Sequence, residues 1–281
     1  MNKLLLASLV SVLYSSPLWA NKNTTHPVSD ALLESQRLNL SKNTEGKGFG
    51  PQSPRDIDSI TGRNQQTFGY APASTAMNLC NIHFHKNAEH KGGEFTLYAG
   101  NGDGRGHNTG YRYSGKLTRE ELKAVDPADV VDELVPGDTI EVHYVYSTAK
   151  VEPGPTLGAC LSEQGVNNPQ LRVETQVYVL VNNPASNDFV ALTKHGVVNG
   201  YHQAFNIPSN TGKPIQYLGS TTGPGFNEQG SPFQVTWSVR PKVTKVDIAT
   251  VYAWLKDNRF KEDHAHGVRN LVINPELLSG Q

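Results

Sequence analysis

Apolar and polar residues alternate along several short stretches of this chain, and glycine and proline separate these stretches from one another. Such alternation predicts β-strands, because successive side chains of a strand point to opposite faces of a sheet. The sequence therefore predicts a β-dominated α+β fold, a single domain around a large, mostly antiparallel or mixed sheet. The predicted strands are residues 78–85, 94–98, 139–146, 176–181, 189–193 and 233–239.

Three helices are predicted at the periphery of the sheet. Ser29 can cap a short helix that extends to Gln36. Thr118 can cap a second helix, with Glu121 completing a capping box. The third covers residues 246–255, where apolar residues recur at helical spacing.

The strand predicted at residues 78–85 carries two histidines, His83 and His85. An extended strand sends residues i and i+2 to the same side, so the two imidazoles can converge on one metal ion. Cys80 and the apolar residues at alternate positions are expected on the opposite face. This layout is typical of a site built on a sheet.

The strand predicted at residues 139–146 repeats this layout, with Glu141 and His143 on the face opposite its apolar residues. Three neutral imidazoles with an open fourth position are the arrangement of catalytic zinc, whereas structural zinc usually has four protein ligands. His83, His85 and His143 therefore form a candidate catalytic metal site. The alternative is three unrelated surface histidines.

The same spacing of two histidines recurs at His264 and His266, within a polar stretch near the C-terminus. We interpret this second pair as part of a solvated loop. It shows that the spacing alone is not specific, and that the third histidine on another strand is what favours a site at His83 and His85.

The N-terminal region has the pattern of an export signal. Residues 1–20 begin Met1-Asn2-Lys3, continue through an apolar stretch and end at Ala20, where cleavage is expected. Residues 21–49 follow as a polar extension. The apolar stretch is too short to span a membrane comfortably, and no later segment is long enough. We expect a secreted protein, periplasmic in a Gram-negative host, with no membrane association after cleavage.

The chain has two cysteines, Cys80 and Cys160. Export places them in an oxidising environment, so a single disulfide is expected. The bond would tether the histidine strand to the loop at residues 153–160. Metal ligation by Cys80 is disfavoured, because Cys80 is expected to face away from His83.

The charge distribution limits the class of partner. The net charge is −1, from 25 basic and 26 acidic residues, and no basic stripe is present. Electrostatics therefore gives no reason to expect nucleic acid, and a small neutral or anionic substrate is more consistent with the chain.

Several short blocks, spread over about residues 50–240, resemble carbonic anhydrases. The intervals between them depart from the alpha class, and residues 81–92 look closer to the delta class, so the chain resembles a bacterial delta-like carbonic anhydrase. The blocks are residues 50–58 with their Gln-Ser-Pro segment, His83-Phe84-His85, residues 141–145, residues 219–224 and Val235-Thr236-Trp237.

This resemblance implies an alpha-carbonic-anhydrase-like fold and a catalytic domain at residues 50–281. It implies Zn²⁺ held by His83, His85 and His143, and a lyase that catalyses the reversible hydration of carbon dioxide to bicarbonate and a proton by attack of zinc-bound hydroxide. A monomer or a homodimer is expected.

The resemblance also implies a catalytic threonine that is oriented by a carboxylate. The inferred pair is Thr221 and Glu89. Thr222 is an alternative to Thr221, and Glu94 or Glu141 is an alternative to Glu89.

Two further roles follow from the chemistry of a histidine-bound metal. Ligating histidines usually donate their second ring N–H to a polar partner, for which Asn78, Asn81 and Glu141 are candidates. A histidine is suited to moving the released proton, and His90 and His107 are candidates.

Two other functions fit part of the pattern. His83, His85 and Glu89 have the spacing of the first cupin motif, and residues 136–138 before His143 are similar to the second. A cupin would hold iron or manganese and act as an oxygenase or isomerase. An exported zinc-binding protein without catalysis is the other alternative.

Overall fold

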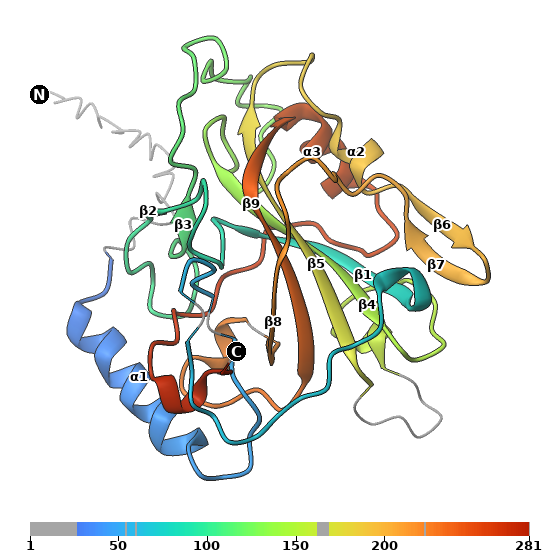
Figure 1. Ribbon diagram of the computed structural model, residues 1–281. Coiled ribbons are helices and arrows are strands. Elements are labelled where there is room, and N and C mark those ends of the chain that lie inside the picture. Colours follow the sequence, from blue (N-terminus) through green and yellow to red (C-terminus); the bar gives the residue numbers. More distant parts are fainter. Residues whose placement is uncertain (1–26, 54, 60, 162–168, 222, 281) are drawn as a thin grey trace, which may run out of the picture.

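A five-stranded sheet forms the centre of the protein in the computed structural model, which describes residues 27–53, 55–59, 61–161, 169–221 and 223–280 (Figure 1). The strand order is β1-β4-β5-β9-β8, with β5 and β9 parallel and the other neighbours antiparallel. The prediction of a β-dominated fold around a mixed sheet is confirmed. The strands are β1 Asn78–Lys86, β4 Thr139–Ser147, β5 Leu171–Val181, β8 Ile215–Ser220 and β9 Gln234–Asp247.

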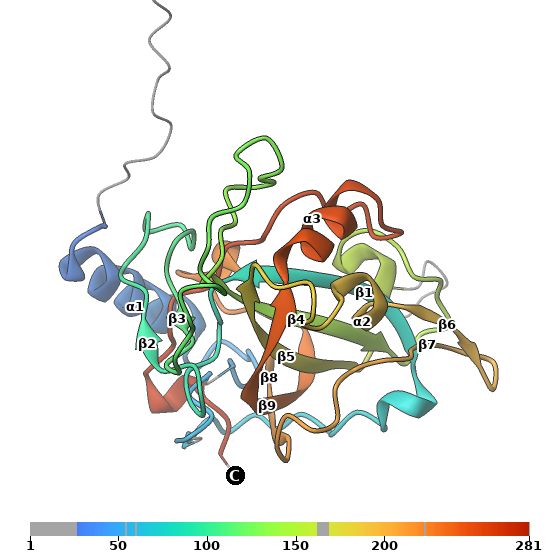
Figure 2. The same ribbon diagram turned by 90° about the horizontal axis from the view of Figure 1, so that it is seen from above.

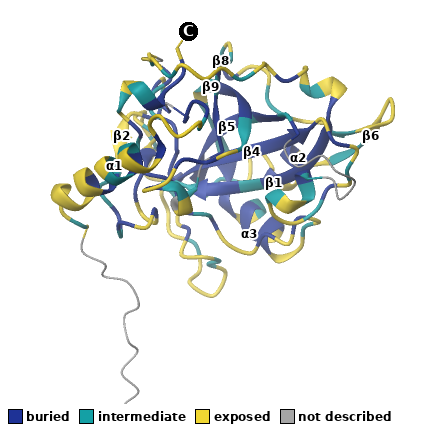
Figure 3. Ribbon diagram, turned by 90° about the horizontal axis from the view of Figure 1, so that it is seen from below, coloured by how far each residue is buried: buried dark blue, intermediate teal, exposed yellow. Residues whose placement is uncertain are grey.

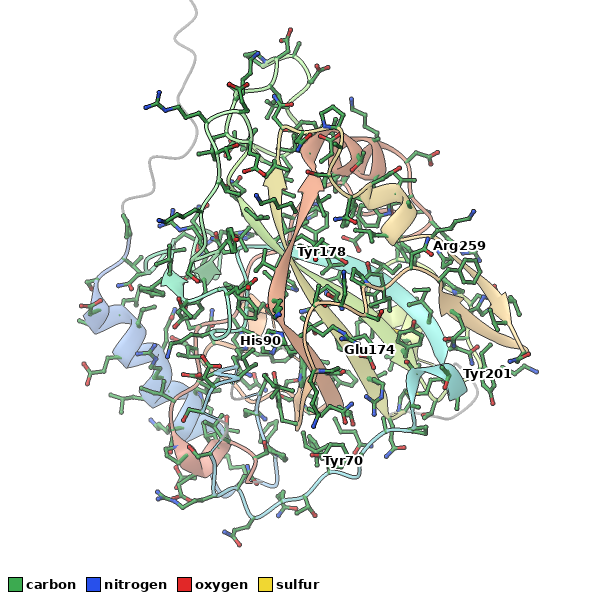
Figure 4. The ribbon with its side chains drawn as sticks, turned by 45° about the horizontal axis from the view of Figure 1, so that its top comes forward. Tyr70, His90, Glu174, Tyr178, Tyr201 and Arg259 are labelled. Carbon is green, nitrogen blue, oxygen red and sulfur yellow. A yellow bond between two sulfur atoms is a disulfide. The ribbon has the colours of Figure 1, made fainter. Side chains whose placement is uncertain are left out.

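Short elements surround this sheet. The helix α1 and the pair β2–β3 lie side by side at one end, and the hairpin β6–β7 projects at the opposite end with Tyr201 at its outer tip (Figures 1, 2 and 4). These elements are α1 Asp30–Thr44, β2 Leu97–Tyr98, β3 Tyr111–Arg112, α2 Phe189–Leu192, β6 His195–Val198, β7 Tyr201–Ala204 and α3 Ile248–Lys256, with 3-10 turns at Ser74–Ala76, Leu157–Cys160, Pro224–Phe226 and Pro275–Leu277.

The two faces of the sheet are buried against different partners, and Figure 3 shows the central strands as the most buried part of the molecule. On one face, Phe84 of β1 packs with α2 and α3, where the rings of Phe189 and Trp254 lie 5.2 Å apart. On the other face, Val145 and Trp237 form a second apolar cluster. The alternation predicted for residues 139–146 is confirmed, because Val142 belongs to the first cluster and Val145 to the second.

The helix predicted at residues 29–36 is confirmed but longer, since α1 extends to Thr44. Leu40 of α1 packs with Val272, Leu277 and Leu278 near the C-terminus. The polar extension therefore packs onto the rest of the protein, and a domain boundary at residue 50 stays a prediction.

The predicted signal at residues 1–20 lies outside the described residues. None of the helices in the described part of the chain is both long and apolar enough to cross a membrane.

Residues 189–193 were predicted as a strand, and this prediction is wrong. They form the short helix α2, because the Asp188 side chain accepts hydrogen bonds from the N–H groups of Val190 and Ala191. Such an N-cap stabilises a helix start even where the following residues favour strands.

The helix predicted after Thr118 is also absent from the structure. The two hydrogen bonds of the capping box do form, from Thr118 N to the Glu121 carboxylate at 2.8 Å and from Glu121 N to Thr118 Oγ1 at 3.2 Å. The chain continues as turns, and Pro127 follows too soon for a stable helix to build.

The predicted orientation of Cys80 is wrong, and the predicted disulfide is confirmed. The register of β1 shifts by one residue between Leu79 and Asn81, so Cys80 packs with Val145 and Trp237 on the histidine face. A bulge of this kind reverses the alternation of side chains locally. Cys80 is bonded to Cys160, which holds the loop at residues 153–160 against β1.

Candidate metal centre

The three predicted histidines come together on one face of the sheet. His83 on β1 lies directly opposite His143 on β4, and His85 is the next residue of β1 on that face. One ring nitrogen of each histidine lies within 4.8 Å of a ring nitrogen of each of the others. The pairing of two antiparallel strands is what brings residues distant in sequence to one point.

The other ring nitrogen of each histidine is engaged by a fixed acceptor. His83 Nδ1–H donates to Asn81 Oδ1 at 2.5 Å, and His85 Nδ1–H donates to the carbonyl oxygen of Gly267 at 2.7 Å. His143 Nε2–H donates to Glu141 Oε1 at 2.7 Å. These hydrogen bonds set the tautomers, so the nitrogens that face one another carry lone pairs.

The remaining nitrogens fit a bound cation. His85 Nε2 is buried and has no hydrogen-bond partner within the described part of the chain. His143 Nδ1 and His83 Nε2 lie 3.3 Å apart, and with these tautomers neither carries a proton to share. Two nitrogens bound tetrahedrally to one zinc at the usual bond lengths are also about 3.3 Å apart. The geometry is therefore that of a three-histidine metal site.

Burial keeps the two β1 histidines unprotonated. Burial is the main cause that lowers the pKa of His83 well below its usual value, and the neighbouring imidazoles lower it further. Burial likewise lowers the pKa of His85 to about 4, against a partial opposing effect of Glu89. Neutral imidazoles are the form that binds metal, so the site is prepared for a cation at neutral pH.

Glu141 and His90 form a buried layer behind His143. Oε1 of Glu141 accepts from His90 Nδ1 at 2.7 Å, and Oε2 accepts from the backbone N–H of His90 at 3.0 Å. His90 Nε2 in turn contacts the Tyr217 hydroxyl. Burial alone would raise the pKa of Glu141, but its electrostatic interaction with His90 and hydrogen bonds from His143 and His90 hold it well below the usual value. His90 is completely buried, and Figure 4 labels it near the middle of the view.

Glu89 lies on the same rear side of the histidines. Its carboxylate oxygens are 3.7 Å from His85 Nδ1 and 3.6 Å from His143 Nε2, the nitrogens that point away from the shared point. Burial would raise the pKa of Glu89, but the Arg55 guanidinium at 3.3 Å and the two imidazoles lower it to about 2. Glu89 is therefore an ionised, buried carboxylate behind the site.

Thr221 stands at the site on the loop that follows β8. Its hydroxyl shares a 2.5 Å hydrogen bond with the Ser231 hydroxyl. Gln52 fixes both sides of this loop, because Gln52 Oε1 accepts from Ser220 Oγ at 3.0 Å and from Ser231 N at 2.9 Å. The alternative threonine, Thr222, lies outside the described residues.

A pocket of about 220 Å³ opens over the three histidines. Thr221 and His266 lie at its edge, and the Trp237 ring stands 5.2 Å from the His143 ring. The apolar part of the wall consists of Val145, Leu157, Leu171, Val173, Val235 and Trp237. The site thus combines three histidines that can bind a cation with a largely apolar pocket wall.

The sequence model of the delta carbonic anhydrase family matches residues 74–250, which is more than half of the chain and includes all three histidines. The chain belongs to the delta carbonic anhydrase family.

No curated protein sequence matches this delta carbonic anhydrase family member significantly. Among solved structures, the alpha-carbonic anhydrase of Photobacterium profundum is similar, with 19% sequence identity, a TM-score of 0.27, and coverage of 80% of this chain and 88% of that chain. A TM-score this low does not define a fold, so the fold of this family member rests on the strand pairing described above.

The second histidine pair was interpreted as solvated loop, and for His266 this is wrong. The backbone of His266 bonds along the edge of β1, and its ring stands 5.3 Å from that of His83. Glu262 accepts from His266 Nε2 at 2.6 Å and raises the pKa of His266. His264 is exposed beside Asp263, as expected. In the sequence, the four-residue spacing of Glu262 and His266 was the signal that could have indicated this contact.

Other candidate residues lie elsewhere in this family member. Asn78 bonds to Ala149 and His202 rather than to a ligating histidine. Glu94 Oε2 accepts from the backbone N–H of Val243 at 2.8 Å. His107 is exposed in the glycine-rich loop before β3. The sequence did not reveal that three buried residues, Arg55, Gln52 and Tyr217, support the side chains and loop of the site.

Acid should destabilise the metal-free protein. The pKa of His85 is about 4 when folded and near 6.5 when unfolded, so the unfolded chain binds more protons between these values and stability falls as pH falls. We expect the free energy of unfolding to be about 2 kcal/mol lower at about pH 5 than at about pH 7 from this group alone. Urea unfolding of the chelator-treated protein at both pH values measures this difference. An identical difference in His85→Gln would contradict the assignment to His85.

Replacement of Glu141 should weaken metal binding without removing a ligand. Glu141→Gln loses the charge that His143 and His90 both face, and we expect metal affinity to fall by about 10- to 100-fold. Competition with a chromogenic chelator measures the affinity. Glu94→Gln is the matched control, because that carboxylate bonds to β9 and should leave the affinity unchanged.

Proposed function

We propose that this protein is a zinc-dependent carbonic anhydrase, a lyase that catalyses the reversible hydration of carbon dioxide to bicarbonate and a proton. The observation that carries the proposal is the set of three ring nitrogens with free lone pairs at one point, each on a histidine whose second nitrogen is already bonded. Membership of the delta carbonic anhydrase family supports it.

His83, His85 and His143, which line the pocket, would hold the zinc ion. When bound, zinc supplies the Lewis acidity that makes a nucleophile from water at neutral pH. The apolar wall with Val145 and Trp237 suits carbon dioxide, which has no charge and no hydrogen-bond donor. Burial lowers the pKa of His83 and of His85, which keeps these two imidazoles neutral and able to bind.

Thr221 and Glu89 are proposed to orient the reactants. Thr221 is placed on the pocket wall, and its bond to Ser231 limits the directions in which its hydroxyl can donate and accept. Glu89 is proposed as the buried carboxylate that fixes hydrogen-bond directions around the site, a role for which Arg55 keeps it ionised. Because Glu89 lies beside the outward nitrogens, its position favours an orienting role over the metal-ligand role of a cupin.

Metal analysis of the purified protein combined with stopped-flow carbon dioxide hydration tests the function. We expect one zinc ion per chain and rapid hydration that is lost on chelation and restored by zinc. Zinc without hydration would instead favour a binding protein, and iron or manganese without hydration would favour a cupin.

The buried disulfide also supports export to the periplasm or outside the cell. The N-terminal sequence of the mature protein tests cleavage after Ala20.

Alanine at Thr221 should slow hydration while zinc stays bound. Loss of an orienting group close to the reacting atoms costs about 100-fold in rate, and we expect this fall in kcat for Thr221→Ala. Thr221→Ser keeps the hydroxyl and should recover most of the activity. The rate is measured by stopped flow at equal zinc content. If Thr222→Ala shows the large loss and Thr221→Ala does not, the role belongs to Thr222.

A further inference from the structure

The three histidines of the metal centre differ in the kind of group that faces their outer ring nitrogen. His85 faces a backbone carbonyl and His143 faces a carboxylate, and both of these groups can only accept a hydrogen bond. His83 faces the side-chain amide of Asn81, which carries an oxygen on one side and an NH₂ group on the other. The tautomer of His83 therefore depends on which way this amide is turned.

The opposite orientation of the amide would stop His83 from binding a metal. If the NH₂ group of Asn81 faced His83, Nδ1 of His83 would have to accept, and its ring proton would move to Nε2. His83 Nε2 lies 3.3 Å from His143 Nδ1, which can accept that proton in a hydrogen bond. The metal-free protein thus has a second hydrogen-bonded arrangement, in which a proton occupies the nitrogen that would bind the cation.

A loop outside the strand decides between the two orientations. The Nδ2 atom of Asn81 donates to the backbone oxygen of Gly154 at 3.0 Å. A carbonyl oxygen has no proton to donate, so only the NH₂ side of the amide can face it. The amide oxygen is then left toward His83, at 2.5 Å from Nδ1, and the proton stays on Nδ1. Gly154 therefore holds the amide in the orientation that keeps His83 Nε2 free for a metal.

The loop at residues 153–160, which contains Gly154, is attached to β1 beside this amide. Gly154 N–H donates at 3.0 Å to the carbonyl oxygen of Cys80, where the register of β1 shifts. The disulfide between Cys80 and Cys160 attaches the far end of the loop to the same place on β1. The loop is therefore fixed at Cys80 and Asn81, just before the two ligating histidines of this strand.

These attachments hold the loop in a strained backbone conformation. Thr156 has a φ of 59° and a ψ of 171°, a region that β-branched residues rarely adopt. Such strain persists only where surrounding contacts maintain it. At the surface, Arg259 Nε donates to the carbonyl oxygen of Pro153 at 2.8 Å. Because a strained loop relaxes when an attachment is lost, the position of the Gly154 carbonyl depends on these bonds.

We propose that the loop at residues 153–160 is a positioning element of the metal centre, which selects the metal-binding tautomer of His83 by orienting the Asn81 amide through Gly154. Asn81 and Gly154 are positioning residues, because they act through His83. This role rests on the proposed function only through the three-histidine site, and it does not depend on carbon dioxide hydration.

Loosening the loop in two backgrounds tests the proposal. Cys80→Ser with Cys160→Ser frees the loop, and the same pair of substitutions is made together with Asn81→Asp. A carboxylate offers His83 an oxygen in either orientation, so it does not need Gly154. We expect the cysteine variant to bind Zn²⁺ about 10- to 100-fold more weakly than the wild type, as for loss of a supporting group. In the Asn81→Asp background the cysteine substitutions should cause no further loss. Competition with a chromogenic chelator measures the affinities.

The tautomer of His83 is a readout that a purely structural role of the loop would not change. Long-range ¹H–¹⁵N spectra of the metal-free, ¹⁵N-labelled protein at neutral pH show which ring nitrogen carries the proton. We expect Nδ1 in the wild type, a shift toward Nε2 in the cysteine variant, and Nδ1 again when Asn81→Asp is added. Asn78→Asp is the matched control, because Asn78 lies on the same strand but donates to Ala149, so it should not restore the tautomer.

Arg259→Gln provides the same comparison if the cysteine variant does not fold. Arg259 is exposed, and loss of its bond to Pro153 loosens the outer end of the loop. We expect a smaller shift of the His83 proton toward Nε2, which Asn81→Asp again reverses. The proposal is overturned if the proton stays on Nδ1 in the cysteine variant, or in Arg259→Gln where the cysteine variant does not fold. It is also overturned if Asn81→Asp does not reverse the shift.

Failure of this proposal and failure of the proposed function give different results. A wild-type protein that binds no zinc would refute the three-histidine site, and the tautomer of His83 would still be measurable. An unchanged tautomer in the loosened loop would refute the positioning role and leave zinc binding and hydration by the wild type as they are.

Discussion

Alanine at His85 should leave the protein without bound zinc and without measurable hydration of carbon dioxide. His85 Nε2 is the buried nitrogen that has no hydrogen-bond partner in the described structure, and His85 Nδ1 is already held by Gly267. Loss of a direct ligand should exceed the about 10- to 100-fold loss in metal affinity that follows loss of a supporting group. Zinc content after dialysis and stopped-flow hydration measure the two effects.

His264→Ala is the matched control for this result. His264 belongs to the other pair of histidines with the same spacing, but it is exposed beside Asp263. We expect wild-type zinc content and wild-type hydration from this variant. Full zinc occupancy in His85→Ala, with a circular dichroism spectrum like that of the wild type, would show that the metal is bound elsewhere.

Removal of the disulfide should cause the largest loss of stability. Cys80 and Cys160 are 80 residues apart, and the chain-entropy model gives about 4 to 5 kcal/mol for closing a loop of this length. The double variant Cys80→Ser, Cys160→Ser should therefore unfold at a much lower urea concentration, measured by tryptophan fluorescence.

The Cys80–Cys160 disulfide should also affect the pocket over the three histidines. The turn Leu157–Cys160 ends at the bonded cysteine, and Leu157 forms part of the apolar pocket wall. We expect hydration by the double variant to fall at temperatures where the protein is still folded. Wild-type protein treated with a thiol reductant is the control for the substitutions themselves, because it loses the bond and keeps both cysteines. Equal urea midpoints for the double variant and the wild type would refute a stabilising role.

The central strands could be predicted because their alternation is long and regular. Residues 139–146 show apolar residues at every second position, and β4 covers them almost exactly as predicted, with Glu141 and His143 on the other face. The short elements were harder to predict. Residues 215–220 alternate weakly around Gly219, so β8 was missed, although β9 pairs with it throughout.

Misassignments occurred where a local interaction overrode the pattern. Asp188 caps a helix at residues predicted as a strand, and the bulge next to Leu79 turns Cys80 to the histidine face. Neither a cap nor a bulge changes the hydrophobic pattern enough to be recognised in one sequence.

The sequence by itself determined the central strands, the three histidines as a set and the cysteine pair, because period-two alternation and residue chemistry are local properties. Tertiary structure alone decided which nitrogens face one another, through acceptors such as Glu141 and Gly267. It also brought His266 to the pocket and Arg269 beside Arg55. Contacts between residues so far apart along the chain depend on strand register and packing, which no local pattern encodes.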